Sequence, residues 1–286
     1  MRRWMAGHHV DAAYITKPVS IAYLTGFQAE PFERLMALAV RPDSATLIVP
    51  AIERQKASAY ADQADVLAWR DGEDPYVLVS EALDGCADVG VEKEHLSVLS
   101  AEVLSARTGV SELVDVSHEI RRLRRTKSDA EIELLQRAAA ITDAAGDQVF
   151  SRMRAGQAEV EISLTLGALI GELGGTLSFE TLAQSGPNSA LPHLRPTGRK
   201  LAAGDFLLLD FGAAFEGYKA DTTRMGVVGE PSARHREIHG LVLDAHDAAI
   251  AAVREGVAAG EVDAAARAVI DSAGYGDRFF HRVGHG

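Results

Sequence analysis

Residues 207–224 read LLLDFGAAFEGYKADTTR, and this stretch decides how the C-terminal half of the chain is organised. A continuous apolar run that ends in Asp210 is typical of a buried strand. The glycines and polar residues that follow predict a turn, so we expect a second strand that begins near Tyr218 and carries Asp221. Two antiparallel strands joined by a short loop would bring Asp210 and Asp221, which are 221 − 210 = 11 positions apart, side by side.

Two carboxylates held together in an apolar setting repel each other and take up protons unless a cation lies between them. Each aspartate alone is explained as well by a capping or turn role, in which backbone N–H groups satisfy its oxygens. The pair Asp210 and Asp221 favours a metal site, because buried charges are normally paired or bound to metal.

The composition excludes several classes of function. A chain of 286 residues predicts about two domains of ~100–200 residues each. Its formal net charge of −12 argues against nucleic acid and anionic membranes as partners. Cys86 is the single cysteine, so neither an intrachain disulfide nor a cysteine-based zinc cluster is possible. No apolar run reaches the ~18 residues of a membrane span, and no secretory signal follows the basic N-terminus, so we expect a cytoplasmic protein.

The first half of the chain alternates short apolar runs with segments of helical spacing, which predicts an α/β domain. Segment 21–27, an apolar run closed by a glycine turn, is interpreted as a packed loop. The predicted strands cover residues 12–15, 35–40, 46–49, 89–91 and 113–116, with a hairpin turn at 42–44, and the predicted helices cover 51–63 and 76–83.

A basic run at residues 120–127 predicts the boundary between two domains, 1–120 and 121–286. Ser128 and Glu131 have the spacing of a capping box, which predicts the start of a long amphipathic helix that ends near Gly156. A second helix is expected from about Glu159 to Leu173.

This helical pattern occurs twice. We align Gly156 with Gly260, an offset of 104 positions, and Ile170 with Ile270, an offset of 100. Two helix–helix–strand units predict a pseudo-symmetric domain with a site at the junction of its halves.

Two histidines stand in turn-rich, accessible sequence. His285 lies between two glycines, and His193 follows a loop that begins at Ser185. A lone histidine in such a loop is most often a surface residue. Together with Asp210 and Asp221, His285 favours metal ligation, since imidazole and carboxylate groups suit zinc, manganese or cobalt.

The ordered motifs resemble those of the creatinase/prolidase metallopeptidases, whose fold is called pita-bread. They are Ser185-Gly-Pro-Asn, Pro192-His193, Asp210-Phe-Gly, Gly217-Tyr-Lys-Ala-Asp221-Thr-Thr-Arg224 and Gly284-His285-Gly286. Residues 20–27 are also similar to the start of that family's creatinase-type N-terminal domain, so the resemblance covers nearly the whole chain. It implies an α/β N-terminal domain followed by an α+β pseudo-symmetric pita-bread domain.

The resemblance also implies roles for individual residues. In the family, two aspartates, one histidine and two glutamates hold two divalent metal ions, and Asp210, Asp221 and His285 match the first three. Asp210 would bind one ion in bidentate fashion, Asp221 would bridge both and His285 would bind the other. His193 and His281 match family histidines that lie near the substrate. A hydroxide that bridges the metals would attack the scissile carbonyl.

The expected activity is hydrolysis of the Xaa-Pro bond in dipeptides, with manganese, cobalt or zinc as the metal. Alternatives are an aminopeptidase P that acts on longer Xaa-Pro peptides, a metal-free creatinase-like C–N hydrolase, and an inactive pita-bread domain that serves as a binding module. By analogy with relatives, we expect a homodimer.

The resemblance is incomplete at the C-terminal end. The family's two glutamate ligands lie beyond its Gly-His-Gly motif, whereas this sequence ends at Gly286. Glu255 and Glu261 match no ligand motif. We therefore expect a pita-bread domain truncated at its C-terminus. If the 286-residue chain is the whole molecule, it should bind divalent metal weakly, and its hydrolysis of proline dipeptides should be close to absent.

Overall fold

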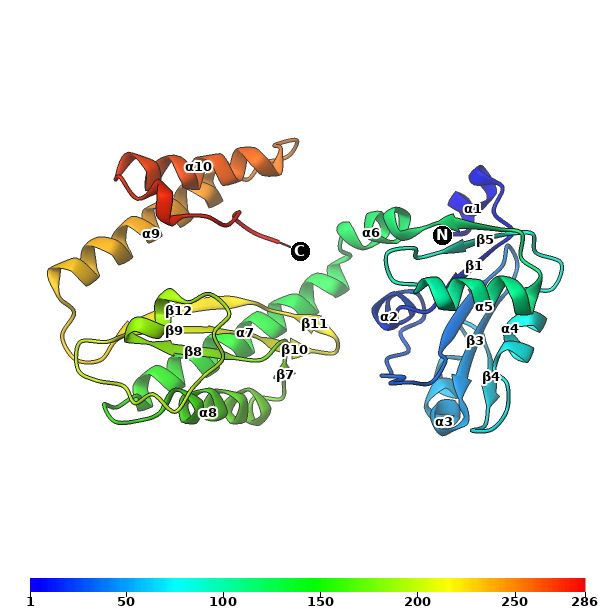
Figure 1. The fold of residues 1–286 in the computed structure, drawn as a ribbon, viewed down its shortest axis with the longest axis horizontal. Helices are drawn as coiled ribbons and strands as arrows, with labels where there is room; N and C mark the ends of the chain where they lie inside the picture. The colour runs from blue at the N-terminus through cyan, green and yellow to red at the C-terminus, as the bar shows by residue number, and fades with distance from the viewer. Residues whose placement is uncertain (286) are drawn as a thin grey trace. The chain divides into compact units, whose positions relative to one another are not determined.

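The computed structural model describes residues 1–285 and divides into two compact units, Met1–Asp129 and Ala130–Gly286. We describe each unit by itself (Figure 1). No helix within residues 1–285 is long and apolar enough to cross a membrane.

Unit 1 is built on one mixed six-stranded sheet in the order β4-β3-β2-β1-β5-β6. Its central strand β1 pairs antiparallel with β2 and parallel with β5. The predicted hairpin is confirmed, because β2 and β3 pair antiparallel across a tight turn in which Arg41 N–H donates to Ser44 O. The strands are β1 (Ala12–Ile15), β2 (Ala37–Val40), β3 (Ala45–Pro50), β4 (Asp65–Trp69), β5 (Asp88–Val91) and β6 (Glu112–Asp115).

Helices cover both faces of this sheet, which makes unit 1 a three-layer α/β domain. One hydrophobic cluster joins β1 through Ala13 and Ile15 to α1, α2, α3 and α6, and the other joins β1 through Ala12 and Tyr14 to α4 and α5. Because side chains alternate along a strand, all four residues of β1 are buried. The helices are α1 (Arg2–His8), α2 (Pro18–Thr25), α3 (Arg54–Ala57), α4 (Tyr76–Ala82), α5 (Val98–Thr108) and α6 (Ser117–Arg125).

Two predictions in unit 1 were wrong. The packed loop expected at 21–27 is mostly helix α2, which starts with Pro18 and is closed by Gly26, whose φ is 79°. The single helix expected at 51–63 is a series of short turns around α3. Ala57 is the buried residue of that segment, and one apolar contact is too little to stabilise a long helix.

Unit 2 holds α7 (Asp129–Arg152), apart from its first residue, and α8 (Glu159–Glu172), both close to the predicted limits. It continues through two three-stranded sheets. One sheet has the order β12-β9-β8 and the other β11-β10-β7. The strands are β7 (Thr176–Leu177), β8 (Leu182–Ser185), β9 (Phe206–Phe211), β10 (Ala213–Phe215), β11 (Tyr218–Lys219) and β12 (Thr222–Val227).

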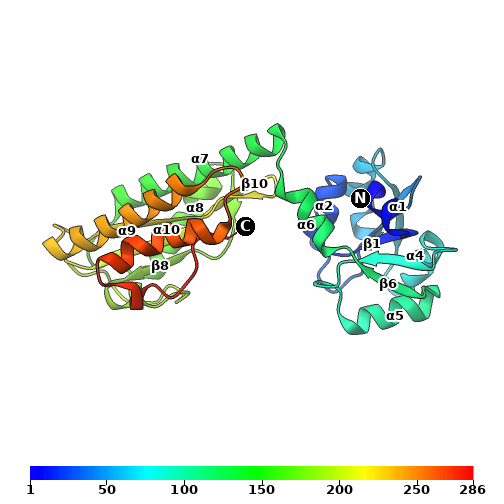
Figure 2. The same ribbon diagram turned by 90° about the horizontal axis from the view of Figure 1, so that it is seen from above.

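Helices α7 and α8 pack against one face of the β12-β9-β8 sheet (Figure 1). Leu207, Leu209 and Phe211 of β9 are fully buried in this contact. Asp210 and Leu208 alternate with them and therefore lie on the opposite face. Helices α9 (Ala233–Ala252) and α10 (Ala259–Ser272) pack on each other and lie on the side of the sheet away from α8 (Figures 1 and 2).

The α7–α8 and α9–α10 pairs repeat at a constant offset of 100 positions. Gly156 and Gly256 both have positive φ, 89° and 79°, and α8 and α10 each have 14 residues. Our alignment of Gly156 with Gly260 was therefore wrong, because Gly260 lies inside α10. The Ala-Gly pairs in both halves made the shifted alignment plausible in sequence alone.

Candidate active site

The predicted aspartates lie where β9 and β12 meet. Thr223 of β12 pairs with Asp210 of β9, and Asp221 directly precedes β12. The single strand expected from Tyr218 through Asp221 was wrong, because the chain forms two strands, β11 and β12, separated by Ala220 and Asp221. The hairpin thus passes from one sheet to the other beside the site.

Gly212 explains this break. A Cβ atom at Gly212 would lie 1.9 Å from the carbonyl oxygen of Ala220 and 2.5 Å from Ser178 Oγ. The same Ala220 carbonyl accepts a 2.7 Å hydrogen bond from Ser178 Oγ. Because only glycine permits this approach, the two chain segments touch through their backbones two residues after Asp210 and one residue before Asp221.

The two carboxyl groups of the site affect each other. Burial raises the pKa of Asp210, and the nearby Asp221 carboxylate raises it further. Thr223, through a hydrogen bond, and His193, through its positive charge when protonated, act in the opposite direction on the same pKa. Asp210 is half-buried and Asp221 is exposed, so this repulsion arises at the rim of the sheet.

His285 lies next to the same pair. Its Nε2 atom is 3.3 Å from Asp221 Oδ2, and its side chain is 73% exposed. The structure therefore brings together Asp210, Asp221, His285 and His193, from three segments of unit 2. Gly286, the last residue of the predicted Gly-His-Gly motif, lies outside the described residues.

His281 is held by the α10 side of unit 2. Its ring packs edge-on against Phe279 with ring centroids 4.9 Å apart, and its carbonyl oxygen accepts a 3.0 Å hydrogen bond from Arg267. Asp263, which pairs with Arg267, also accepts the Val283 N–H. The contacts described for His281 thus tie it to α10 rather than to the aspartate pair.

Glu159 is a site-supporting residue that sequence reasoning missed. It is fully buried at the first turn of α8, and its two carboxylate oxygens accept hydrogen bonds from Ser185, Asn188 and Thr197. Burial acts to raise its pKa, but these hydrogen bonds outweigh burial and the pKa of Glu159 is lowered. The available signal was a carboxylate at a helix start that precedes a Ser-Gly-Pro-Asn loop.

The donor chemistry at Asp210, Asp221 and His285 fits a divalent cation. Carboxylate oxygens and imidazole nitrogens suit manganese, cobalt and zinc, and a cation would relieve the repulsion between the two carboxylates. Among residues 1–285, no three His, Cys, Asp or Glu side chains are grouped closely enough to hold one ion together. Asp221 instead forms one pair with Asp210 and a second pair with His285.

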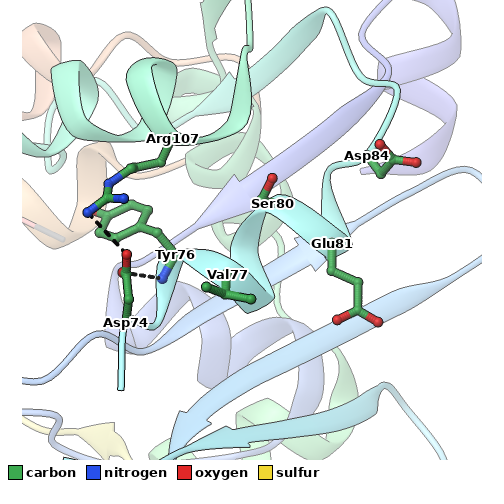
Figure 3. Close-up of a pocket in the computed structure, with 7 residues that line it drawn as sticks. All are labelled: Asp74, Tyr76, Val77, Ser80, Glu81, Asp84 and Arg107. Atoms are coloured by element: carbon green, nitrogen blue, oxygen red, sulfur yellow. Dashed lines mark hydrogen bonds and ion pairs between the residues drawn. The ribbon is translucent and has the colours of Figure 1, made fainter. Parts of the chain in front are cut away.

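Away from these side chains, pockets among residues 1–285 include one in each unit. The larger, of about 470 Å³, is in unit 1 between α4 and α5, where Arg107 pairs with Asp74 at 3.1 Å (Figure 3). The charged side chains that line this pocket are of both signs, and Arg107 is already neutralised by Asp74. We therefore do not take this pocket as the active site. The smaller, of about 250 Å³, is in unit 2 and is lined by Phe206, Met225, Gly226, Val227, Gly229, Pro231, His235, Arg236 and His239.

Known proteins that resemble this chain over nearly its whole length include Xaa-Pro peptidases. The chain is 36% identical over 294 residues to the Xaa-Pro dipeptidase of Lactobacillus helveticus. This alignment covers 100% of our chain and 80% of the dipeptidase. It is similar in structure to the prolidase of Pyrococcus furiosus, with 31% identity, a TM-score of 0.91 and coverage of 100% and 82%. The X-Pro aminopeptidase of Thermotoga maritima MSB8 gives 27% identity, a TM-score of 0.90 and coverage of 99% and 80%.

Two family models divide the chain between them. The creatinase/prolidase N-terminal domain matches residues 1–126, and metallopeptidase family M24 matches residues 133–286. These matches confirm the resemblance found in the sequence motifs. The chain therefore belongs to metallopeptidase family M24, with a creatinase/prolidase N-terminal α/β domain ahead of a peptidase domain of the pita-bread fold.

Proposed function

We propose that this chain hydrolyses the Xaa-Pro peptide bond of dipeptides in a reaction that depends on divalent metal. The observation that carries the proposal is the closeness of the Asp210 and Asp221 carboxyl groups at the β9–β12 junction, with His285 beside Asp221 and His193 near enough to act on the pKa of Asp210. Its second support is the 36% identity to a dipeptidase across the full length of this chain.

Each site residue has a proposed role. Asp210, Asp221 and His285 would hold the metal, which when bound supplies a Lewis acid and a water molecule activated at neutral pH. Thr223 donates a hydrogen bond to Asp210 and so favours the ionised carboxylate that a metal requires. His193, exposed on its loop, can donate to a substrate carbonyl oxygen as that oxygen gains negative charge. We propose His281 as a second substrate-side histidine by resemblance alone.

The test is release of free proline from Ala-Pro and Gly-Pro by the purified chain, first stripped by a chelator and then supplied with Mn²⁺, Co²⁺ or Zn²⁺. We expect slow proline release that requires metal, because residues 1–286 carry counterparts of only three of the five metal ligands that the family resemblance implies. Asp221→Asn should lower the metal-dependent rate by about 100-fold or more, since losing even an outer partner of a metal ligand costs about 10–100-fold. Asp244→Asn, on the exposed surface of α9, is the matched control and should leave the rate unchanged.

Other substrates separate the alternatives. Cleavage of Ala-Pro-Gly in preference to Ala-Pro would favour an aminopeptidase P, the activity named for the Thermotoga relative. Equal cleavage of Ala-Ala and Ala-Pro would contradict specificity for proline. Proline release that is indifferent to both the chelator and Asp221→Asn would contradict the metal-dependent mechanism.

A further inference from the structure

The loop that carries His193, residues 186–196, is fixed to unit 2 at two levels. We call it the His193 loop. At its base, the two residues that flank it, Ser185 and Thr197, both donate to the buried carboxylate of Glu159, at 2.7 Å and 2.6 Å from their hydroxyl groups. Asn188, inside the loop, donates to the same carboxylate. These contacts close the two ends of the loop on one point.

A second level of contact holds the tip of the loop, and it comes from Gln184. The Gln184 side-chain amide donates to the carbonyl oxygens of Leu191 and Leu194, each at 2.9 Å. These carbonyls lie two residues before and one residue after His193. Both N–H donors of the amide are thus used on the backbone that flanks His193.

The strand register places Gln184 on the same face of the sheet as Asp210. Gln184 pairs with Leu208 and Leu182 pairs with Asp210, so all four side chains project to one side. Gln184 is only 2% exposed, although this is the face that α7 and α8 leave uncovered. The His193 loop is what folds back over it.

His193 itself has a backbone conformation that requires support. Its φ is 62°, in the left-handed region that residues other than glycine seldom adopt. Such a conformation persists when surrounding contacts hold it in place. The two hydrogen bonds from Gln184 hold the backbone on either side of this residue. When His193 is protonated, its positive charge acts to lower the pKa of Asp210.

We propose that Gln184 is a positioning residue, whose amide holds the backbone on both sides of His193 and so fixes where the imidazole lies relative to Asp210. Glu159 holds the two ends of the His193 loop together, and Gln184 fixes the backbone around His193. The expected effect of Gln184 on kcat rests on the proposed function, whereas its effect on the backbone of the His193 loop does not.

The first test needs no activity. In Gln184→Met, a side chain of similar size loses both donors. Hydrogen exchange of the four backbone amides within residues 191–196, those of Leu191, His193, Leu194 and Arg195, should therefore accelerate about 10- to 30-fold when followed by mass spectrometry. Gln136→Met, at an exposed position on α7, should leave that exchange unchanged. Gln184→Glu is a second variant of the same size, whose carboxylate cannot donate to the two carbonyls and should accelerate exchange as well. Unchanged exchange in both folded Gln184 variants would overturn the proposal.

The second test asks whether Gln184 acts through His193. Gln184→Met should lower kcat for Ala-Pro about 10- to 100-fold with KM nearly unchanged, because a misplaced group loses mainly transition-state interaction. In a His193→Ala background the same change should have almost no effect on kcat. An equal loss in both backgrounds would overturn the positioning role. Absence of proline release by the wild-type chain would reject the proposed function and leave the exchange result to decide the proposal.

Discussion

At Gly212, the two strands of the site touch through backbone atoms. The added methyl group of Gly212→Ala would meet the Ala220 carbonyl, which Ser178 already holds. Overpacking typically costs about 1–3 kcal/mol, and we expect the upper end because the obstructing atom belongs to the backbone. Urea denaturation followed by circular dichroism should show this loss of stability in unit 2.

The control for Gly212→Ala is Gly171→Ala. Gly171 is an exposed helical residue of α8 with nothing within 4 Å of an added Cβ. Alanine is the better helix former, so Gly171→Ala should raise the free energy of unfolding by about 0.5–1 kcal/mol. If Gly212→Ala unfolds at the same urea concentration as the wild type, the close approach of the two backbones does not limit the folded state.

Glu159 makes stability depend on pH. Burial acts to raise its pKa, but the hydrogen bonds from Thr197 and Ser185 hold it below its ordinary value of 4.5. The unfolded chain therefore binds a proton more readily than the folded chain, and acid favours unfolding. The contribution of Glu159 is fully present above about pH 4.5 and is lost as the pH falls through the lowered pKa.

Substitution tests this sign. Glu159→Gln should destabilise the protein at pH 7, and the difference in free energy of unfolding from the wild type should narrow as the pH is lowered from 7 to 3. Glu133→Gln, at an exposed position on α7, is the matched control and should give no such trend. A difference that stays constant over this range would show that Glu159 is not held ionised by its donors.

At the scale of elements, α7 and β9 meet through a glycine and a large side chain. A Cβ atom at Gly146 would lie 2.9 Å from Phe211 Cζ, and Phe211 is fully buried. Gly146→Ala gains about 1 kcal/mol of helix propensity but overpacks the contact at a cost of about 1–3 kcal/mol, so we expect a net loss of stability.

Adding the smaller Phe211→Leu should relieve that overpacking. In a double-mutant cycle measured by urea denaturation, the pair should be more stable than the sum of the single changes by about 0.5–3 kcal/mol. If the changes in free energy of unfolding of the two single variants simply add in the double variant, α7 and β9 accommodate the extra methyl group without overpacking.

Elements whose pattern reflects burial could be predicted from sequence. Strand β1 and the start of α8 lie where they were expected, because apolar periodicity and capping residues act locally. Helix α2 also carried local signals, Pro18 and Gly26, which the interpretation as a loop overlooked. The short turns at 51–60 could not be predicted from spacing, since the number of buried contacts depends on the rest of the fold.

The candidate site was predictable where sequence motifs are ordered and short. Asp210, Asp221, His193 and His285 were all named from sequence, and the structure places them near one another. Glu159 and Gln184 were missed because their partners lie between 7 and 38 positions away in the chain and only the fold brings them into contact. Polar residues that support a site therefore give a weaker signal than the residues that form it.

At the scale of the whole molecule, each unit has hydrophobic clusters of its own. The chain contains two tryptophans, Trp4 and Trp69, and both lie in unit 1, where they pack against its two clusters. Tryptophan fluorescence therefore reports on the unfolding of unit 1, whereas far-ultraviolet circular dichroism reports on both units. We predict from the separate cores that the two units unfold in distinct transitions.

Matched core substitutions test this prediction. Leu38 of β2 is 1% exposed in unit 1 and Leu209 of β9 is 0% exposed in unit 2, and a leucine-to-alanine change at such positions costs about 2–5 kcal/mol. Leu38→Ala should lower the urea midpoint seen by fluorescence. Leu209→Ala should lower a circular dichroism transition and leave the fluorescence midpoint in place, because the cavity it creates lies in the other core. If Leu209→Ala shifts the fluorescence midpoint as much as Leu38→Ala does, the two units unfold as one cooperative body and the stability of the candidate site depends on the N-terminal domain.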